Sequence, residues 1–240
     1  IEKNGLYSAS YQMSKPMSSY LLALAIGNYK KTVEKSRSGI SIENYLSAED
    51  SDKYSTTYSN SKQMFDFLER EIGVPYPWEI YRQVPIKDFL YGGMENTALT
   101  TFAQDYVVDK IGHNDKNYDN VSAHELAHQW FGDKVTCGTW QDIWLNEGFA
   151  VYLSGLVIQN QDGDSAYRSY KQSEIDYITY FPGGAVYLTP EEAQNSDRIF
   201  SGRLTYSKGG MVVNMLKLKL GQEAFLLGVN NYLNDPALAY

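Results

Sequence analysis

Two histidines and two glutamates form the pattern in this sequence that is most able to do chemistry. His124 and His128 stand four residues apart around Glu125, and Glu147 follows after eighteen intervening residues. On a helix, side chains four positions apart project from one face, so both imidazoles can bind a single cation. Two imidazoles and one carboxylate are typical ligands of a catalytic zinc site, which keeps its fourth position for water. The pattern therefore predicts such a site, with Glu125 beside the water.

The third ligand is chosen by comparing the candidates along the chain. A second class of zinc peptidase would need a histidine six residues after His128, where this sequence has Lys134. His113 lies in a polar stretch and is expected to be a solvated loop residue. Cys137, the single cysteine, is expected to be a small buried hydrophobe. Glu147 fits best, because it opens an apolar-periodic segment that predicts a second helix packed beside the first.

Three segments in a fixed order carry a family resemblance. The chain resembles the aminopeptidase N family of gluzincin zinc metallopeptidases in GGMEN (Gly92 to Asn96), HELAHQWFGDKVT (His124 to Thr136) and WLNEGFAVY (Trp144 to Tyr152). The likeness covers most of the chain beyond Arg70. It implies an α+β fold, with a thermolysin-like catalytic domain at residues 36–240. Residues 1–35 would be the tail of an N-terminal β domain, present as remnant β strands.

The resemblance also implies a role for each residue of the site. His124, His128 and Glu147 would bind one Zn²⁺ ion as the cofactor. Glu125 would be the general base that takes a proton from zinc-bound water and hands it to the leaving amine. Tyr206 stands where the family has the tyrosine that donates a hydrogen bond to the tetrahedral oxyanion.

The GGMEN segment distinguishes an aminopeptidase from a peptidase that cuts inside chains. The resemblance implies that Gly92, Gly93, Met94, Glu95 and Asn96 lie along the backbone of the substrate, and that Glu95 receives its free α-amino group. Two glycines let a backbone approach a ligand closely. An internal peptide segment lacks the ammonium group and would leave the glutamate unpaired. The implied partners are therefore peptide substrates with a free N-terminus.

The chain departs from the family pattern at two positions. Relatives usually carry a glutamate seven residues after the third ligand, where it braces a zinc histidine, and this sequence has Ser154. The loss of such an outer partner costs about ten- to a hundredfold in metal affinity or activity. Another side chain, or Ser154 through a water molecule, would have to replace it. Asp133 stands where asparagine is more usual, which is a milder change.

The composition is that of a soluble globular protein. With 240 residues, of which 43% are hydrophobic, the chain can bury a sizeable core. A net charge of -8 argues against nucleic acid as a partner. No apolar run approaches the roughly 18 residues that a membrane span needs. A single cysteine excludes an internal disulfide and leaves the cytoplasm, the periplasm and secretion open as compartments. We expect an excised piece that lacks most of the N-terminal β domain and the C-terminal helical domain of its full-length relatives.

Hydropathy patterns predict the elements that position the site. Alternating or apolar runs predict strands within residues 1–58, including one from Tyr20 to Gly27. A helix is predicted from Asn60 to Ile72, and the zinc helix from Asp119 to Phe131. The remaining predictions are strands at 82–86 and 98–107, turns at 159–164 and 181–184, and two helices at 209–220 and 222–233.

Three functions from different classes stay open. The leading one is a zinc aminopeptidase that removes N-terminal residues from peptides. The second is another zinc hydrolase on the same scaffold, such as an endopeptidase or an epoxide hydrolase, and GGMEN argues against a plain endopeptidase. The third is a non-catalytic scaffold, against which the intact Glu125 and Tyr206 argue.

Overall fold

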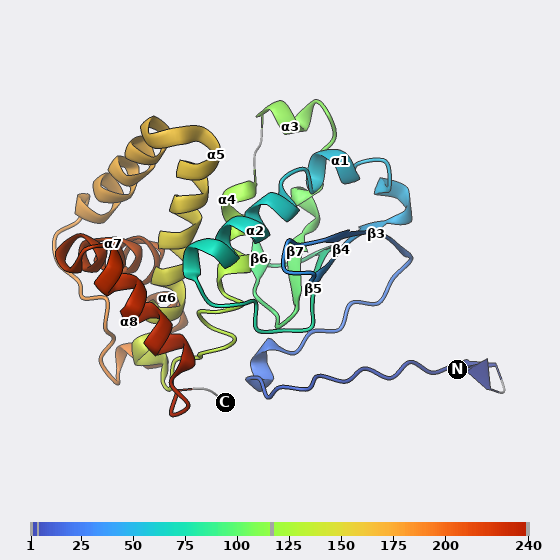
Figure 1. Ribbon diagram of the computed structural model, residues 1–240, viewed down its shortest axis with the longest axis horizontal. Coiled ribbons are helices and arrows are strands. Elements are labelled where there is room, and N and C mark those ends of the chain that lie inside the picture. Colours follow the sequence, from blue (N-terminus) through green and yellow to red (C-terminus); the bar gives the residue numbers. More distant parts are fainter. Residues whose placement is uncertain (1, 4, 116–117, 239–240) are drawn as a thin grey trace.

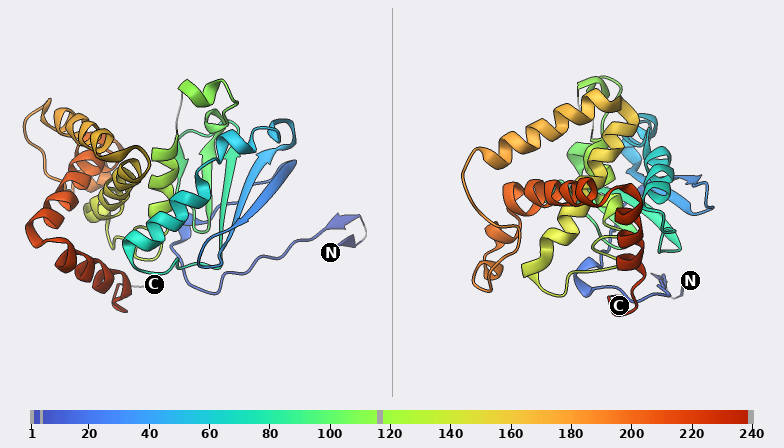
Figure 2. Two further views of the ribbon diagram at one scale, coloured as in Figure 1. Left: turned by 45° about the horizontal axis from the view of Figure 1, so that its top comes forward. Right: turned by 60° about the vertical axis from the view of Figure 1, so that its left-hand side comes forward.

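The computed structural model describes residues 2–3, 5–115 and 118–238. Within this range, a five-stranded sheet lies on one side of the molecule and the long helices α5, α7 and α8 lie on the other (Figure 1). Helices α2 and α4 lie between them and contact α5. The N-terminal segment extends away from the sheet, as Figure 1 and the left view of Figure 2 show. This mixture of a small sheet and packed helices is the α+β architecture predicted from the sequence.

The sheet has the strand order β3-β4-β5-β7-β6. Its central pairs, β4 with β5 and β5 with β7, are parallel, whereas both outer pairs are antiparallel. The strand β6 therefore lies at an edge, and a separate two-stranded sheet precedes the main one. The strands are β1 (Glu2–Lys3), β2 (Leu6–Tyr7), β3 (Tyr29–Lys35), β4 (Ser41–Ser47), β5 (Ile80–Ile86), β6 (Gly93–Met94) and β7 (Leu99–Ala103).

The helices vary from single turns to a long kinked element. None of those in the described part of the chain combines the length and apolar character that a bilayer crossing requires. The α-helices are α1 (Tyr54–Thr57), α2 (Ser61–Ile72), α3 (Gly112–Asp115), α4 (Asp119–Ala127), α5 (Ile143–Thr179), α6 (Ser196–Ile199), α7 (Gly209–Leu220) and α8 (Gln222–Asn234). Short 3-10 turns are η1 (Ser19–Leu21), η2 (Ala48–Asp50), η3 (Gln104–Tyr106), η4 (Trp140–Asp142) and η5 (Glu192–Gln194), and η6 (Gly202–Lys208) is a π-helix.

Helix α2 confirms the predicted first helix and supplies part of the core. Met64, Phe65, Leu68 and Ile72 recur at helical spacing and are all buried. The helix ends at Gly73, whose φ of 72° is left-handed and is readily adopted by glycine. The buried residues of this helix belong to one cluster with those of α4 and α5, so a continuous apolar core supports the elements that carry the site.

The predicted strand from Tyr20 to Gly27 is wrong. Residues 19–21 form the 3-10 turn η1, and residues 22–28 are in no strand. Leu22, Leu24 and Ile26 alternate along the chain, yet each is at least 74% exposed. Alternation identifies side chains that point the same way, but a strand also needs a neighbour for its backbone hydrogen bonds.

Two further elements end earlier than predicted. Strand β7 ends at Ala103 because the next three residues turn into η3. Helix α4 ends at Ala127, and His128 caps it with helical dihedrals (φ -58°, ψ -24°). Beyond it, Gln129 and Trp130 bond to carbonyls only three residues back, which tightens the chain into a 3-10-like turn.

The long helix α5 contains the turn predicted at residues 159–164. Gly163 has φ 85° and ψ 178°, so two helical pieces meet there at a kink. The turn near Phe181 is also present, with φ of 79° at Gly183. Helices α7 and α8 have the predicted bounds to within one residue, and Gly221 separates them. The division of the chain at residue 35 stays a prediction; strand β3, which lies before it, pairs with β4.

Candidate metal centre and its surroundings

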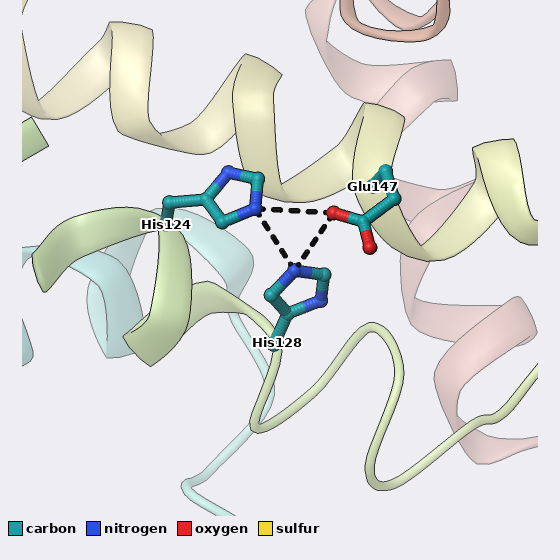
Figure 3. A group of neighbouring side chains, drawn as sticks. All are labelled: His124, His128 and Glu147. Carbon is teal, nitrogen blue, oxygen red and sulfur yellow. Dashed lines mark hydrogen bonds and ion pairs between the residues drawn. The ribbon is translucent and has the colours of Figure 1, made fainter. Parts of the chain in front are cut away.

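Two packed helices bring the predicted metal ligands together. His124 lies in α4, His128 caps that helix, and Glu147 lies in the first turns of α5. The two helices contact each other through buried small and apolar residues such as Ala127 and Ala150. The side chains of all three candidate ligands point toward one another (Figure 3).

The three ligand atoms form a compact triangle. His124 Nε2 lies 3.1 Å from Glu147 Oε2 and 3.0 Å from His128 Nε2. The third side, from His128 Nε2 to Glu147 Oε2, is 3.2 Å (Figure 3). Tetrahedral zinc with bonds of about 2.0–2.1 Å would place its ligand atoms roughly 3.3 Å apart. The triangle therefore has the dimensions of three corners of such a site.

A backbone hydrogen bond orients His128 for metal binding. Its Nδ1 lies 2.8 Å from the carbonyl oxygen of Phe131, which can only accept, so Nδ1 carries the proton. The Nε2 lone pair then faces the other two ligand atoms. Burial lowers the pKa of His128, but the carboxylates of Glu147 and Glu95 more than reverse this and raise it above its ordinary value. The surroundings thus favour positive charge at this point, and the donor set fits a zinc ion.

Two more carboxylates lie beside the triangle. Ligand atoms of Glu95, Glu125 and His128 lie within 4.8 Å of one another, and all three side chains are buried. Burial, together with the neighbouring carboxylates, raises the pKa of Glu125 well above its usual value. Burial also raises the pKa of Glu95. A buried carboxyl with a raised pKa is a candidate general acid or base.

The segment from Gly92 to Asn96 approaches the site along the edge of the sheet. Gly93 in β6 pairs with Phe102 in β7. A Cβ on Gly93 would lie only 2.5 Å from Glu125 Oε1, so glycine permits this close approach. The Met94 side chain is half-buried, next to Glu95.

Gln129 ties this segment to the end of α4. Its side chain donates to the carbonyl of Glu95 and accepts from the amide of Ala98 and from the hydroxyl of Tyr76. This fully buried residue was not among the site residues predicted from the sequence. Its position directly after His128 was visible in the sequence, but partners more than 30 residues away cannot be recognised from spacing.

Tyr206 reaches the same site from the C-terminal half of the chain. It lies in the π-helix η6, and its ring stacks on His124 with the centroids 5.8 Å apart. Burial, with the charges of Glu147 and Glu95, raises the pKa of Tyr206 far above its ordinary value. The hydroxyl therefore stays protonated and can donate a hydrogen bond. Single π-helical turns are frequent at functional sites.

Comparison with known proteins agrees with this geometry. Residues 56–239 match the peptidase family M1 domain. The chain belongs to peptidase family M1. It is 30% identical over 236 residues to glutamyl aminopeptidase of Bos taurus, covering 93% of this chain and 24% of the relative. It is 31% identical over 241 residues to aminopeptidase M1 of Arabidopsis thaliana, covering 95% of this chain and 27% of the relative.

Solved structures of M1 zinc metallopeptidases have the same fold. One from Deinococcus radiodurans, bound to a Tyr-Ser-Ala substrate, has a TM-score of 0.82 and 25% identity over all of this chain and 51% of its own. A two-domain M1 zinc metallopeptidase bound to L-tryptophan has a TM-score of 0.81, with the same identity and coverage. The chain thus spans about a quarter of the length of the curated relatives and about half of the solved chains.

Two positions of this M1 chain were singled out in the sequence as departures from the family pattern. The Ser154 hydroxyl donates to the carbonyl of Val151, one turn back in the same helix, at 2.9 Å. Asp133 is buried, and both carboxylate oxygens lack a hydrogen-bond partner among the described residues. His128 has its own outer partner in the backbone carbonyl of Phe131, which no side-chain pattern predicts.

The two alternative ligands lie outside the triangle. His113 is in the short helix α3, not in the loop that was expected, and it lines a cavity with Tyr118. Cys137 is half-buried with a free thiol, and burial raises its pKa to about 11. Neither belongs to a group of potential metal ligands in the part of the chain that the structure describes.

Proposed function

We propose that this chain is the catalytic part of a zinc aminopeptidase, which hydrolyses the first peptide bond of a peptide. The observation that carries the proposal is the position of Glu95. Its carboxylate lies within 4.8 Å of a ring nitrogen of His128 and of the Glu125 carboxylate, so an acidic anchor stands directly beside the candidate metal centre. The named relatives are aminopeptidases, which agrees with this proposal.

The metal centre would consist of His124, His128 and Glu147. Their three facing atoms, 3.0–3.2 Å apart, fit the borderline-soft, tetrahedral preferences of zinc. When bound, zinc supplies a Lewis acid that polarises a carbonyl and acidifies water. The remaining chemistry falls to residues of the chain.

Three side chains would carry the proton transfers and the binding of charge. Glu125, with its raised pKa, accepts the proton of the attacking water and delivers it to the nitrogen of the leaving peptide. Tyr206 donates a hydrogen bond to the oxyanion of the tetrahedral intermediate. Glu95 pairs with the substrate ammonium, which holds the first peptide bond next to Glu125. The segment from Gly92 to Asn96 lies along the backbone of the substrate.

A substrate panel tests the proposal. The zinc-loaded chain is assayed for release of a fluorophore from free aminoacyl substrates and from their N-acetylated counterparts, next to Glu125→Gln. We expect release from free amines only, and its loss in the variant at unchanged zinc content. Cleavage of the acetylated substrates would identify an endopeptidase instead. A chain that holds one zinc ion per molecule and cleaves neither class would be a scaffold or a part that needs the flanking domains of its relatives, and the same assay on the full-length protein would separate the two.

A further inference from the structure

A cavity beside the candidate metal centre has no place in the mechanism described above. It has a volume of about 570 Å³, which lies within the range of roughly 300–1,000 Å³ typical of small-molecule sites. Its walls come from the segment before and within η1, from the loop before η4 together with η4 itself, and from residues before and within η5. The apolar part of the lining consists of Met17, Tyr20, Trp140, Pro190 and Ala193.

The first wall is fixed next to the amine anchor. Leu21, at the end of η1, accepts hydrogen bonds through its carbonyl from the Asn96 side chain at 3.2 Å and from the Thr97 amide at 3.3 Å. Both donors directly follow Glu95 in the chain. Tyr20, one residue before Leu21, is therefore held close to the carboxylate that would bind the substrate ammonium.

The second wall is fixed next to the third metal ligand. The amide of Cys137 donates to Asn146 Oδ1 at 3.2 Å, and Asn146 immediately precedes Glu147. A hydrogen bond of 3.2 Å between Ser18 and Thr136 joins the two walls. The cavity is thus bordered by residues anchored at the amine end and at the metal end of the site.

This placement matches the path of one substrate group. The N-terminal residue of a substrate would have its ammonium group at Glu95 and its carbonyl group at the metal ligands. Its Cα atom, which carries the side chain, would therefore lie between these two points. Burial raises the pKa of the Tyr20 hydroxyl and of the Cys137 thiol, and the charges of Glu95 and Glu147 raise both pKa values further, so both groups lie in the electrostatic field of these carboxylates. The side chain would therefore leave the backbone beside the mouth of this cavity.

The lining indicates which side chains fit. None of the described residues that line the cavity is charged. The rings of Tyr20 and Trp140, whose centroids are 5.8 Å apart, offer an apolar surface of the kind that packs well against aromatic or branched side chains. A charged side chain would lose its hydration there without gaining a partner of opposite charge.

We propose that this cavity receives the side chain of the substrate's N-terminal residue and selects bulky uncharged side chains, with Trp140 and Tyr20 as contacts. This inference rests on the proposed aminopeptidase function. It also separates the chain from a peptidase specific for N-terminal glutamate, because the carboxylate of such a substrate would require a positively charged partner in the cavity, and no lining side chain supplies one.

The test compares kcat/KM for phenylalanyl, leucyl, alanyl, glutamyl and lysyl aminomethylcoumarins, measured on the zinc-loaded chain. We expect the phenylalanyl and leucyl substrates to exceed the glutamyl and lysyl substrates by at least about tenfold. In Trp140→Ala, the ratio of phenylalanyl to alanyl kcat/KM should fall about tenfold, because lost apolar contact in a pocket is worth about that much. The control Leu218→Ala removes an apolar side chain that is 74% exposed on α7, and should leave the ratio unchanged.

Two results would overturn the inference while leaving the aminopeptidase function intact. One is faster cleavage of the glutamyl or lysyl substrate, and the other is an unchanged phenylalanyl-to-alanyl ratio in Trp140→Ala. If no substrate is cleaved, a binding measurement can still test the role of the cavity separately from the aminopeptidase function. Calorimetric titration of Glu125→Gln with L-phenylalaninamide and L-alaninamide should give about tenfold tighter binding of the former, and equal affinities would contradict the cavity's role.

Discussion

Tyr206 stacks on His124 and keeps its hydroxyl proton because burial and the surrounding carboxylates raise its pKa. Tyr206→Phe removes that donor and preserves the ring. We expect kcat to fall by about 100- to 1,000-fold, as for other single oxyanion donors, with the zinc content unchanged. Tyr180→Phe, which alters an exposed hydroxyl, serves as the control. A kcat equal to that of the parent chain would exclude Tyr206 from the reaction.

Glu95 would bind the substrate ammonium through its negative charge and would take no part in the proton transfers. Glu95→Gln keeps the shape of the side chain and removes the negative charge. We expect kcat/KM for free aminoacyl substrates to fall by about 10- to 100-fold, since a hydrogen bond to a charged group is worth about 1.5–3 kcal/mol. Preference for free over acetylated amines should shrink in parallel. If the variant discriminates as well as the parent chain, the ammonium is recognised by another group.

Helices α5 and α7 touch each other close to two residues of the site, Glu147 and Tyr206. A Cβ on Gly148 would lie 2.7 Å from the backbone carbon of Gly209, so these helices cross at a distance that only glycine allows. Gly148 directly follows Glu147 in α5, and Gly209, the first residue of α7, lies three residues after Tyr206. The distance between the Glu147 and Tyr206 side chains therefore depends on how closely Gly148 and Gly209 approach.

Gly148→Ala should separate the two helices. Overpacking of this kind costs about 1–3 kcal/mol, and we expect a lower free energy of unfolding together with a lower kcat. Gly228→Ala is the matched control, because no neighbouring atom lies within 4 Å of a Cβ there and alanine favours helix α8. Full activity in a Gly148→Ala protein would show that the helix crossing does not position the site. Denaturant titration and steady-state kinetics measure both effects.

The strands β3, β4 and β5 share one charge cluster around the buried Glu43. Glu43 on β4 binds Lys31 on β3 at 2.5 Å and Arg82 on β5 at 3.0 Å, and accepts a hydrogen bond from Tyr45. Burial raises the pKa of Glu43, but the hydrogen bonds from Lys31 and the other donors outweigh this effect and lower the pKa to about 2. Because the folded pKa lies below the unfolded one, the cluster stabilises the fold above about pH 4.5 and loses this effect as the pH falls toward 2.

Glu43→Gln should therefore destabilise the protein by about 1–3 kcal/mol at pH 7 and much less at pH 3. Urea titrations at the two pH values measure the difference. The exposed Glu191→Gln should change stability little at either pH. An equal loss at both values would mean that packing, and not the charge of Glu43, stabilises the three strands.

At the scale of the whole molecule, the metal should couple the helices to each other. The candidate ligands come from α4 and α5, and a ligand that binds only the folded state stabilises it by RT ln(1 + [L]/Kd), about 4 kcal/mol at a thousandfold excess over Kd. Removal of metal with a chelator should lower Tm, and added zinc should restore it. His124→Ala should lose this zinc-dependent shift. An identical Tm with and without zinc would mean that zinc does not bind preferentially to the folded chain.

The sequence predicted the parts of the site that depend on local periodicity. The spacing of His124 and His128 follows from helix geometry, and both side chains lie beside Glu147 in the structure. Contacts between distant segments were not predictable in this way. Gln129 bonds to residues far away in the chain, and the cavity wall at Tyr20 was mistaken for a strand because alternation does not reveal whether a partner strand exists.

The position of β6 at the edge of the sheet limits the backbone conformation of the substrates that the site can bind. β6 pairs with β7 on one side, and no other described strand lies on its outer side. A chain that adds to such an edge must itself be extended over several residues, because the hydrogen bonds run between backbones. A terminus wound into a helix or packed into a folded domain cannot do so. Under the proposed function, the protein would therefore sort its targets by whether their first residues are unstructured as well as by their identity.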